Sequence, residues 1–248
     1  MTALPFYIQD WFAWIPGRAG DAAQVGHADI GPIASRQPIP LLLRRRISPL
    51  GQQALKAAWS LSASATARMV FCSRHGEFSR TLSILDAIAN HTEVSPADFT
   101  LSVHNALMGL LSIVRNNRHG HIAVAAGEES FGFGMMEALA CLVERPEEPV
   151  LLVYFDEPLP LPFTGFVPHA SGPIVLALTL TTNGGTTNEG TSHQGESVTL
   201  TTSPASGVLT GPDSFASTFL HFLSGTAPAA SVAGEQLVWH WRRAGTSN

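Results

Sequence analysis

Residues 102–130, SVHNALMGLLSIVRNNRHGHIAVAAGEES, form the stretch of sequence that decides the fold. The apolar spacing over 99–113 predicts a helix, a polar and basic turn follows, and 122–126 is a short apolar run typical of a buried strand. Gly127 then bends the chain into a second predicted helix at 130–143. The stretch therefore predicts a strand that enters a helix through a sharp turn.

The same alternation of strands and helices extends to both sides. Short apolar runs predict strands, and apolar residues that recur on one face predict helices. Such an alternation favours an α/β fold with a mostly parallel sheet covered by helices on both faces. The predicted elements are strands at 6–15, 69–72 and 149–155, helices at 47–69 and 78–89, and a loop over 18–40.

The composition changes after Asp156, where prolines follow at short intervals. Strands at 174–182 and 197–202 predict a hairpin around a polar, Gly-rich loop at 182–196, which we expect to be mobile. We expect residues 1–157 to form the main α/β body. Residues 158–248 then form a short antiparallel extension, packed in the same domain. This extension also has a predicted helix at 215–223 and a final strand at 236–241.

The composition excludes some classes of protein. The chain has 248 residues, of which 45% are hydrophobic and only 13% charged, against about 25% charged in average domains. Extensive burial and a large interface are expected. The net charge of −5 gives no electrostatic basis for binding nucleic acid. No uninterrupted apolar window is long enough for a membrane span, and the N-terminus lacks the pattern of a signal peptide.

Cys72 and Cys141 do not form a disulfide framework. Both lie in apolar surroundings, which predicts buried, inert thiols. Low cysteine use fits a reducing compartment, and we expect the protein in the cytoplasm. His75 lies three residues after Cys72, so a Cys–His dyad is conceivable, but a buried thiol with a histidine in the next turn is favoured.

Glu128 and Glu129 lie at the predicted turn into the 130–143 helix, where free amides and the helix dipole favour negative charge. In the simplest interpretation one carboxylate caps the helix and the other faces solvent. The alternative is that the pair serves in acid/base chemistry, although adjacent side chains usually point apart. The nearby His104, His119 and His121 do not converge on any predicted element, so we expect no metal site and no cofactor.

Four motifs together resemble a known family. VFCSRHGEFSRTLSILDAI, SPADFTLSVHNALMGLLSI, AVAAGEESFGFGMMEAL and LLVYFDEPLP are similar to the β-ketoacyl synthase-like N-terminal family, and in particular to chain-length-factor subunits of bacterial aryl polyene clusters. The resemblance implies a thiolase-like fold that is truncated relative to a full ketosynthase. Counted without gaps from Asn105 and Gly109, Glu128 occupies the position of the ketosynthase cysteine. Glu129 takes that position if the turn at 119–120 is shifted by one residue.

The resemblance implies a subunit without catalytic residues. The nucleophilic cysteine is absent, and the histidine motifs of ketosynthases do not appear after Asp156. A heterodimer with a catalytic ketosynthase is implied, with transient contact to an acyl carrier protein. The run Arg44–Arg46 is either a solvated face or a docking point for that acidic carrier. The implied partner interface is Ile122, Ala123, Val124, Ala125 and Ala126, and the residues implied to shape the acyl tunnel are Phe99, Ser102 and Val103.

Two other functions stay open at this point. One is an independent enzyme in which Glu128 acts as an acid or base in malonyl decarboxylation. The other is a homodimeric scaffold that binds acyl groups. For Phe99, Ser102 and Val103, ordinary core packing is the alternative to a role in the tunnel.

Overall fold

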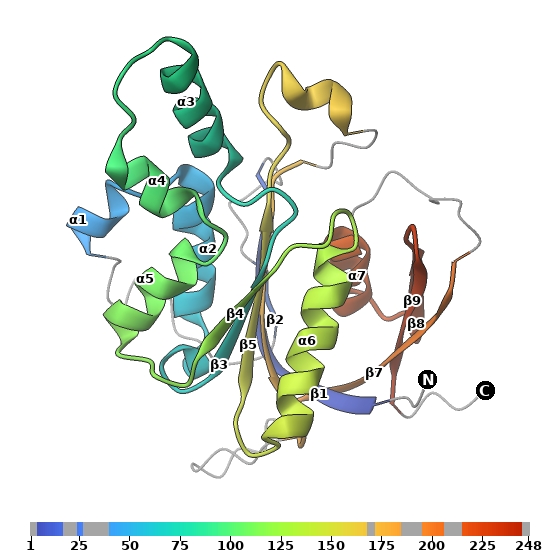
Figure 1. Ribbon diagram of the computed structural model, residues 1–248. Helices are drawn as coiled ribbons and strands as arrows, with labels where there is room; N and C mark the ends of the chain where they lie inside the picture. Colours follow the sequence, from blue (N-terminus) through green and yellow to red (C-terminus); the bar gives the residue numbers. More distant parts are fainter. Residues whose placement is uncertain are drawn as a thin grey trace.

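The computed structural model describes residues 4–16, 24–26, 40–167, 172–184, 195–205 and 215–244, and shows a sheet with helices on both faces (Figure 1). Most of the predicted loops at 18–40 and 182–196 lies outside the described residues. The predicted mobility of the second loop therefore stays a prediction, as does a boundary between two regions at residue 157.

Nine strands form one mixed sheet in the order β4-β3-β5-β6-β1-β7-β9-β8, with β2 paired to β1 beside this path. Their bounds are β1 Leu4–Trp14, β2 Gln24–Gly26, β3 Arg68–Cys72, β4 His121–Val124, β5 Val150–Asp156, β6 Ile174–Thr181, β7 Glu196–Pro204, β8 Ala229–Ala233 and β9 Leu237–Arg243. The prediction for residues 236–241 is thereby confirmed as β9, and β8 was not predicted.

The prediction that the sheet is mostly parallel is wrong. Only β3 is paired in parallel, with β4 on one side and β5 on the other, and the other pairings among the described strands are antiparallel. Parallel neighbours need a long crossover, usually a helix. Helices connect β3, β4 and β5, whereas only a 3₁₀ turn at Phe163–Phe166 is described between β5 and β6. β6 therefore returns beside β5 in the opposite direction.

The predicted hairpin of 174–182 with 197–202 is also wrong. β6 and β7 each pair with β1, as in the pairs Trp11↔Leu178 and Phe6↔Val198, so β1 lies between them. The alternation of apolar residues correctly identified both strands. The alternation does not specify which strands are neighbours in the sheet. The N-terminal strand β1 lies between β6 and β7 because its own side chains are buried.

Two helical layers cover the sheet (Figure 1). α2 and α5 pack on one face, in a core with Ala54, Met69 and Leu111, and α6 and α7 pack on the other, in a core with Phe131, Phe219 and Trp241. The second core is rich in aromatic rings. The helices are α1 Leu41–Arg44, α2 Pro49–Ser60, α3 Phe78–Ala89, α4 Pro96–Ser102, α5 Ala106–Arg115, α6 Ser130–Glu144 and α7 Phe215–Ser224.

The predicted helices 47–69 and 99–113 are each interrupted. α2 ends at Ser60, its C-cap Leu61 is extended, and a 3₁₀ turn at Ser62–Ala65 follows. Val103 is also extended, with ψ of 145°, so the second segment divides into α4 and α5. These two helices are bent by 93° at the break. Within the described residues no single helix has the length and hydropathy of a membrane span, and only this bent pair meets both criteria together.

Candidate functional site

Strand β4 forms one edge of the sheet. It pairs with β3 through Met69↔His121 to Cys72↔Val124, and no described strand pairs with its other side. The Gly120 carbonyl accepts from the Met69 amide of β3, and the Val124 carbonyl accepts from the Ser73 amide just after β3. Because backbone groups alternate sides along a strand, the N–H and C=O of Ala123 face the open edge. The ladder of β4 ends at Val124, two residues before the predicted end, and Ala126 forms an isolated bridge with Glu128.

The turn from β4 into α6 is fixed by its own hydrogen bonds. Gly127 has φ of 58°, which suits glycine because other residues rarely adopt it. The Ser130 hydroxyl is fully buried; it accepts from the Ala126 amide at 2.9 Å and donates to the Gly127 carbonyl at 2.6 Å. These bonds determine the directions in which the two following carboxylates leave the backbone. The expected sharp turn between strand and helix is therefore present.

Glu128 is held in an ion pair. Its Oε1 accepts from Nη1 of Arg74 at 3.0 Å, and the exposed fractions of the two side chains are 17% and 19%. Arg74 lies two residues after the end of β3, so the pair joins the segments that follow two neighbouring parallel strands. The negative charge of Glu128 is thus balanced by the positive charge of Arg74. Glu128 therefore does not face solvent freely, contrary to the simplest interpretation.

Glu129 is buried on the opposite side of the turn, with 4% of its surface exposed. Its Oε1 accepts from Trp239 Nε1 at 2.9 Å and from the Leu237 amide, and its Oε2 accepts from the Gln236 amide. Although it stands at the N-cap of α6, it makes no side-chain capping bond. The predicted cap is therefore wrong, because the β8–β9 turn offers this carboxylate three donors.

The ends of β3 and β5 carry further buried polar groups. Burial raises the pKa of Asp156 to about 6, although hydrogen bonds from Tyr154 and from the backbone and the charge of Arg74 oppose this shift. Asp156 Oδ1 is buried without a hydrogen-bond partner, and Oδ2 accepts from Tyr154 Oη at 3.3 Å. Burial lowers the pKa of His75, with smaller contributions from Arg74 and His104. The charge of Arg74, the partner of Glu128, thus acts on both Asp156 and His75.

Neither cysteine is placed for nucleophilic chemistry. Both are free and buried, as predicted. Burial raises the pKa of the Cys72 thiol far above its ordinary value, and the thiol donates to the Val153 carbonyl at 3.6 Å. Cys72 points at α6, since a Cβ on Gly134 would lie 2.5 Å from its sulfur. The favoured sequence interpretation, a buried thiol with a histidine in the next turn, is confirmed.

The residues proposed for the acyl tunnel lie on α4 and at its end. Phe99 is 64% exposed and Val103 is 46% exposed, so neither belongs to the core. Ser102 is partly buried, and its hydroxyl donates to the Phe99 carbonyl at 2.8 Å. The alternative of ordinary core packing is therefore wrong for Phe99 and Val103. Other large apolar side chains are also exposed on α3 and α5, namely Leu85, Ile88 and Ile113.

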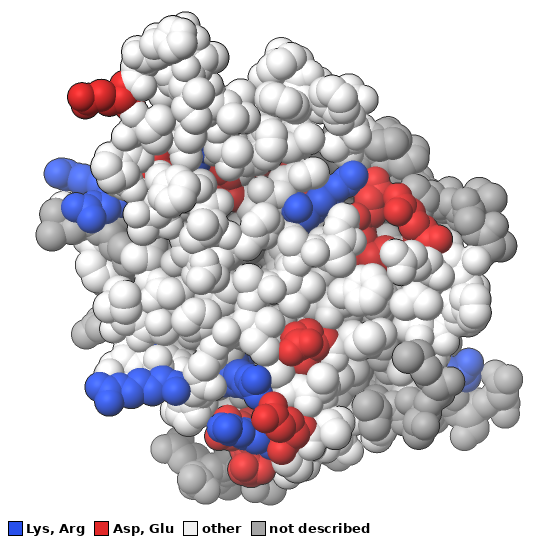
Figure 2. All heavy atoms as spheres, in the orientation of Figure 1, with Lys and Arg blue, Asp and Glu red and all other residues white. Residues whose placement is uncertain are grey.

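The view in Figure 2 shows a surface with few charged side chains. Broad uncharged areas separate small groups of acidic and basic residues, in keeping with the low charged fraction of the chain. Among the described residues, no three His, Cys, Asp or Glu side chains lie together in a way that fits a metal ion.

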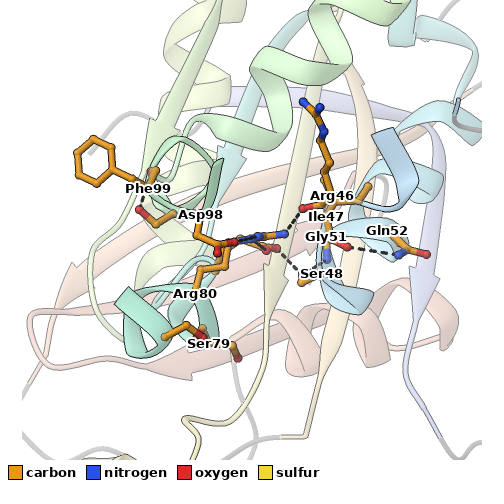
Figure 3. A network of polar contacts seen from close by, with 12 residues as sticks. Arg46, Ile47, Ser48, Gly51, Gln52, Ser79, Arg80, Asp98 and Phe99 are labelled. Carbon is orange, nitrogen blue, oxygen red and sulfur yellow. Dashed lines mark hydrogen bonds and ion pairs between the residues drawn. The ribbon is translucent and has the colours of Figure 1, made fainter. Parts of the chain in front are cut away.

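A polar network on α3 was not predicted. The guanidinium of Arg80 contacts Glu77, Asp98 and the Arg46 carbonyl (Figure 3). Glu77 lies three residues before Arg80, a spacing at which helical side chains meet, and this pair is the signal that the sequence offered. Asp98 and the Arg46 carbonyl come from other segments, which no spacing rule connects to Arg80.

Comparisons with known proteins agree with this fold. The family model described as "Beta-ketoacyl synthase, N-terminal domain" matches residues 11–242. The chain therefore belongs to this family, and its fold is the thiolase-like α/β fold of ketosynthases. No curated protein sequence matches the chain.

Solved structures give the same result in more detail. One chain of the complex between the ketosynthase ApeO and its chain length factor ApeC from Xenorhabdus doucetiae superposes with a TM-score of 0.76. It is 26% identical, and the alignment covers 97% of this chain and 100% of that one. The similarity therefore extends over a protein of about the same length.

Two more distant structures show the fold alone. One is the ishigamide ketosynthase/chain length factor, with a TM-score of 0.53 and 14% identity over 81% of this chain and 68% of that chain. The other is the AntDE:AntF complex, a type II polyketide synthase ketosynthase with its acyl carrier protein, with a TM-score of 0.54 and 13% identity over 72% and 62%.

Proposed function

We propose that this chain is a non-catalytic chain-length-factor subunit that pairs with a catalytic ketosynthase in aryl polyene synthesis. The observation that carries the proposal is the turn between β4 and α6. In the family this turn holds the nucleophilic cysteine, and here it holds Glu128, paired with Arg74. The similarity to a chain of a ketosynthase–chain length factor complex supports the same role.

Catalytic silence follows from the charge at the turn. An acyl transfer site needs a nucleophile, an activating base and donors for an oxyanion within mutual reach. Glu128 places a compensated carboxylate there, which repels an oxyanion and cannot form a thioester. The thiol nearest in sequence to Arg74, that of Cys72, is buried with a strongly raised pKa.

The acylation state of the complex tests this silence. After incubation with acyl carrier thioesters, intact-mass spectrometry should find acyl groups on the ketosynthase and none on this chain. Glu128→Gln in the intact complex should leave turnover near that of the wild type. A stable acyl adduct on this chain, or loss of malonyl decarboxylation in Glu128→Gln, would instead establish the enzymatic function.

In this proposal the ketosynthase pairs with the open edge of β4. Antiparallel addition of the partner's equivalent strand would satisfy the free backbone groups and continue the sheet across the dimer. The small side chains of Ala123 and Ala125 allow such an approach. An obligate interface of this kind buries about 2,000 Å² or more. The interface then comprises Ile122–Ala126 together with the exposed apolar residues of α3 to α5.

Proline at Ala123 tests this interface. The substitution removes the N–H that faces the open edge and leaves the bonds of Val124 to β3 in place. We expect copurification with the ketosynthase to fall at least about tenfold, as on loss of a central hydrogen-bonded contact. Ala123→Ser keeps the N–H and is the matched control. If Ala123→Pro and Ala123→Ser copurify equally, β4 is not the pairing strand. If the chain is a stable dimer by itself and ignores the ketosynthase, the homodimeric scaffold is correct.

Two further parts of the proposal concern the acyl chain. The exposed end of α4 carries Phe99, Ser102 and Val103, which would border the partner's acyl tunnel.

The acyl carrier protein makes transient contact, and the exposed run Arg44–Arg46 supplies positive charge for an acidic carrier. This charge gives docking that weakens as ionic strength rises.

A further inference from the structure

The guanidinium of Arg80 uses all three of its nitrogens to join separate segments. Nη1 donates to Asp98 Oδ1 on α4 at 2.7 Å, and Nε donates to Glu77 Oε2 at the start of α3 at 3.0 Å. Nη2 donates to the Arg46 carbonyl, just before α2. A planar guanidinium can donate to three acceptors in different directions, whereas the ammonium of lysine does not match this arrangement of acceptors.

Glu77, one of the acceptors of Arg80, is closely packed against the start of α2. Glu77 is 5% exposed, and its second oxygen accepts from the Ser48 hydroxyl at 2.5 Å. Ser48 in turn accepts from the Gly51 amide at 2.9 Å as the N-cap of α2. A Cβ on Gly51 would lie 2.7 Å from Glu77 Oε1, so only glycine allows this approach. The Glu77 carboxylate is therefore fixed to the body of the protein.

By contrast, α3 and α4 have little packing of their own. None of the side chains of α3 is fully buried, and on α4 only Leu101 is. Burial of apolar area normally sets the position of a helix. Here the charge-assisted bonds of Arg80 tie α4, through Asp98, to the start of α3 at Glu77. The side-chain exposures of Arg80 and Asp98 are 15% and 39%, so solvent screens this contact only in part.

Phe99 directly follows Asp98 in the same helical turn. Figure 3 shows Asp98 turned toward Arg80, and Phe99 pointing away from the network. Because the two residues are neighbours in one helical turn, a displacement of α4 that pulls Asp98 away from Arg80 also moves Phe99.

We propose that Arg80 is a positioning residue that fixes, through Asp98, where Phe99 stands against the partner's acyl tunnel. The proposal rests on the proposed function, since it needs a tunnel that Phe99 borders. It adds a length-setting role for residues that do not touch the acyl chain. Asp98 carries the link to α4, and Glu77 with Ser48 forms the fixed end.

The test uses the complex with the catalytic ketosynthase and compares product lengths. Asp98→Asn removes the charge from the bond to α4, and Arg80→Lys keeps the positive charge but loses the three-way contact of the guanidinium. The control is Glu144→Gln, which cuts a single ion pair between Arg68 and α6, far from α4 in the chain. Phe99→Ala serves as the reference that opens the tunnel directly. Amide hydrogen exchange of residues 96–103 in the full chain reports on the position of α4.

We expect Asp98→Asn and Arg80→Lys to raise amide exchange in α4 by roughly tenfold, the loss of one charge-assisted bond. Both should shift or broaden product length in the direction of Phe99→Ala, and Glu144→Gln should have no effect. If Phe99→Ala changes product length and Asp98→Asn does not, the proposal for Arg80 is wrong. If Phe99→Ala itself changes nothing in an active complex, the tunnel role fails, and the proposal for Arg80 fails with it.

Discussion

Helices α6 and α3 are comparable in length but differ completely in burial. α6 has 15 residues and buries nine of them, whereas α3 has 12 residues and buries none. α6 lies across the sheet, while α3 stands away from it beside α4 (Figure 1). A helix with exposed Leu85 and Ile88 loses apolar burial that a soluble monomer would normally gain. The difference separates α6, which belongs to the core, from α3, whose apolar side chains stay uncovered in this chain.

The two glutamates at the start of α6 give the largest expected difference within the scaffold. Glu129→Ala leaves Trp239 Nε1 and two backbone amides without their acceptor. We expect the free energy of unfolding to fall by about 3 kcal/mol. Glu128→Ala breaks only the partly exposed pair with Arg74, and we expect a loss of about 1 kcal/mol or less. Urea denaturation of both variants measures the two losses.

Equal losses for Glu128→Ala and Glu129→Ala would contradict this assignment. They would mean that the β8–β9 turn does not depend on Glu129, or that the Arg74 pair carries more stability than its exposure allows. Unchanged m-values are needed for the comparison, because they show that both variants unfold from equally compact states.

Asp156 gives a smaller, pH-dependent effect at the carboxyl end of β5. Its folded pKa of about 6 exceeds the ordinary value of 3.8, so the folded state holds this proton more tightly than the unfolded state. The contribution to stability is therefore fully present below about pH 4 and is lost as the pH rises through about 6. Because the residue as a whole is partly exposed, we expect about 1–2 kcal/mol rather than the full shift.

Asp156→Asn should remove this dependence. Between pH 4 and pH 7, the wild type should lose about 1–2 kcal/mol more unfolding free energy than the variant. Asp86→Asn, an exposed change on α3, should follow the wild type. Parallel pH profiles for the wild type and Asp156→Asn would show that the carboxyl group is ionised at pH 4 in the folded state as well.

Sequence periodicity predicted most elements because single elements depend on local patterns. The predicted helix at 78–89 has the bounds of α3, and the predicted strand at 69–72 lacks only one residue of β3. The order of strands in the sheet depends on contacts between distant segments. For this reason β6 and β7 were paired with each other in the prediction, although β1 lies between them.

The site was predictable in position but not in its contacts. The strand, the bend at Gly127 and the two carboxylates were all indicated by residues 122–130. The partners of these carboxylates lie 54 residues away at Arg74 and 110 residues away at Trp239. No local sequence pattern specifies partners so far away in the chain. The expectation that the side chains of Glu128 and Glu129 point apart was correct, because it follows from their being adjacent residues.

The smallest expected effect on the isolated chain comes from α3, where the comparison of the two helices can be made with one substitution. Leu85 on α3 is 48% exposed and Leu142 on α6 is 3% exposed. Leu142→Ser puts a hydroxyl into the core and should cost about 3 kcal/mol. Leu85→Ser should change the unfolding free energy by less than about 0.5 kcal/mol.

In the complex, Leu85→Ser should weaken the affinity for the ketosynthase by roughly tenfold if this side chain is buried at the interface. Thermal denaturation of the isolated chain and titration with the ketosynthase separate the two effects. An unchanged affinity would show that the apolar face of α3 is not part of the pairing surface, and would confine that surface to β4 and its neighbours.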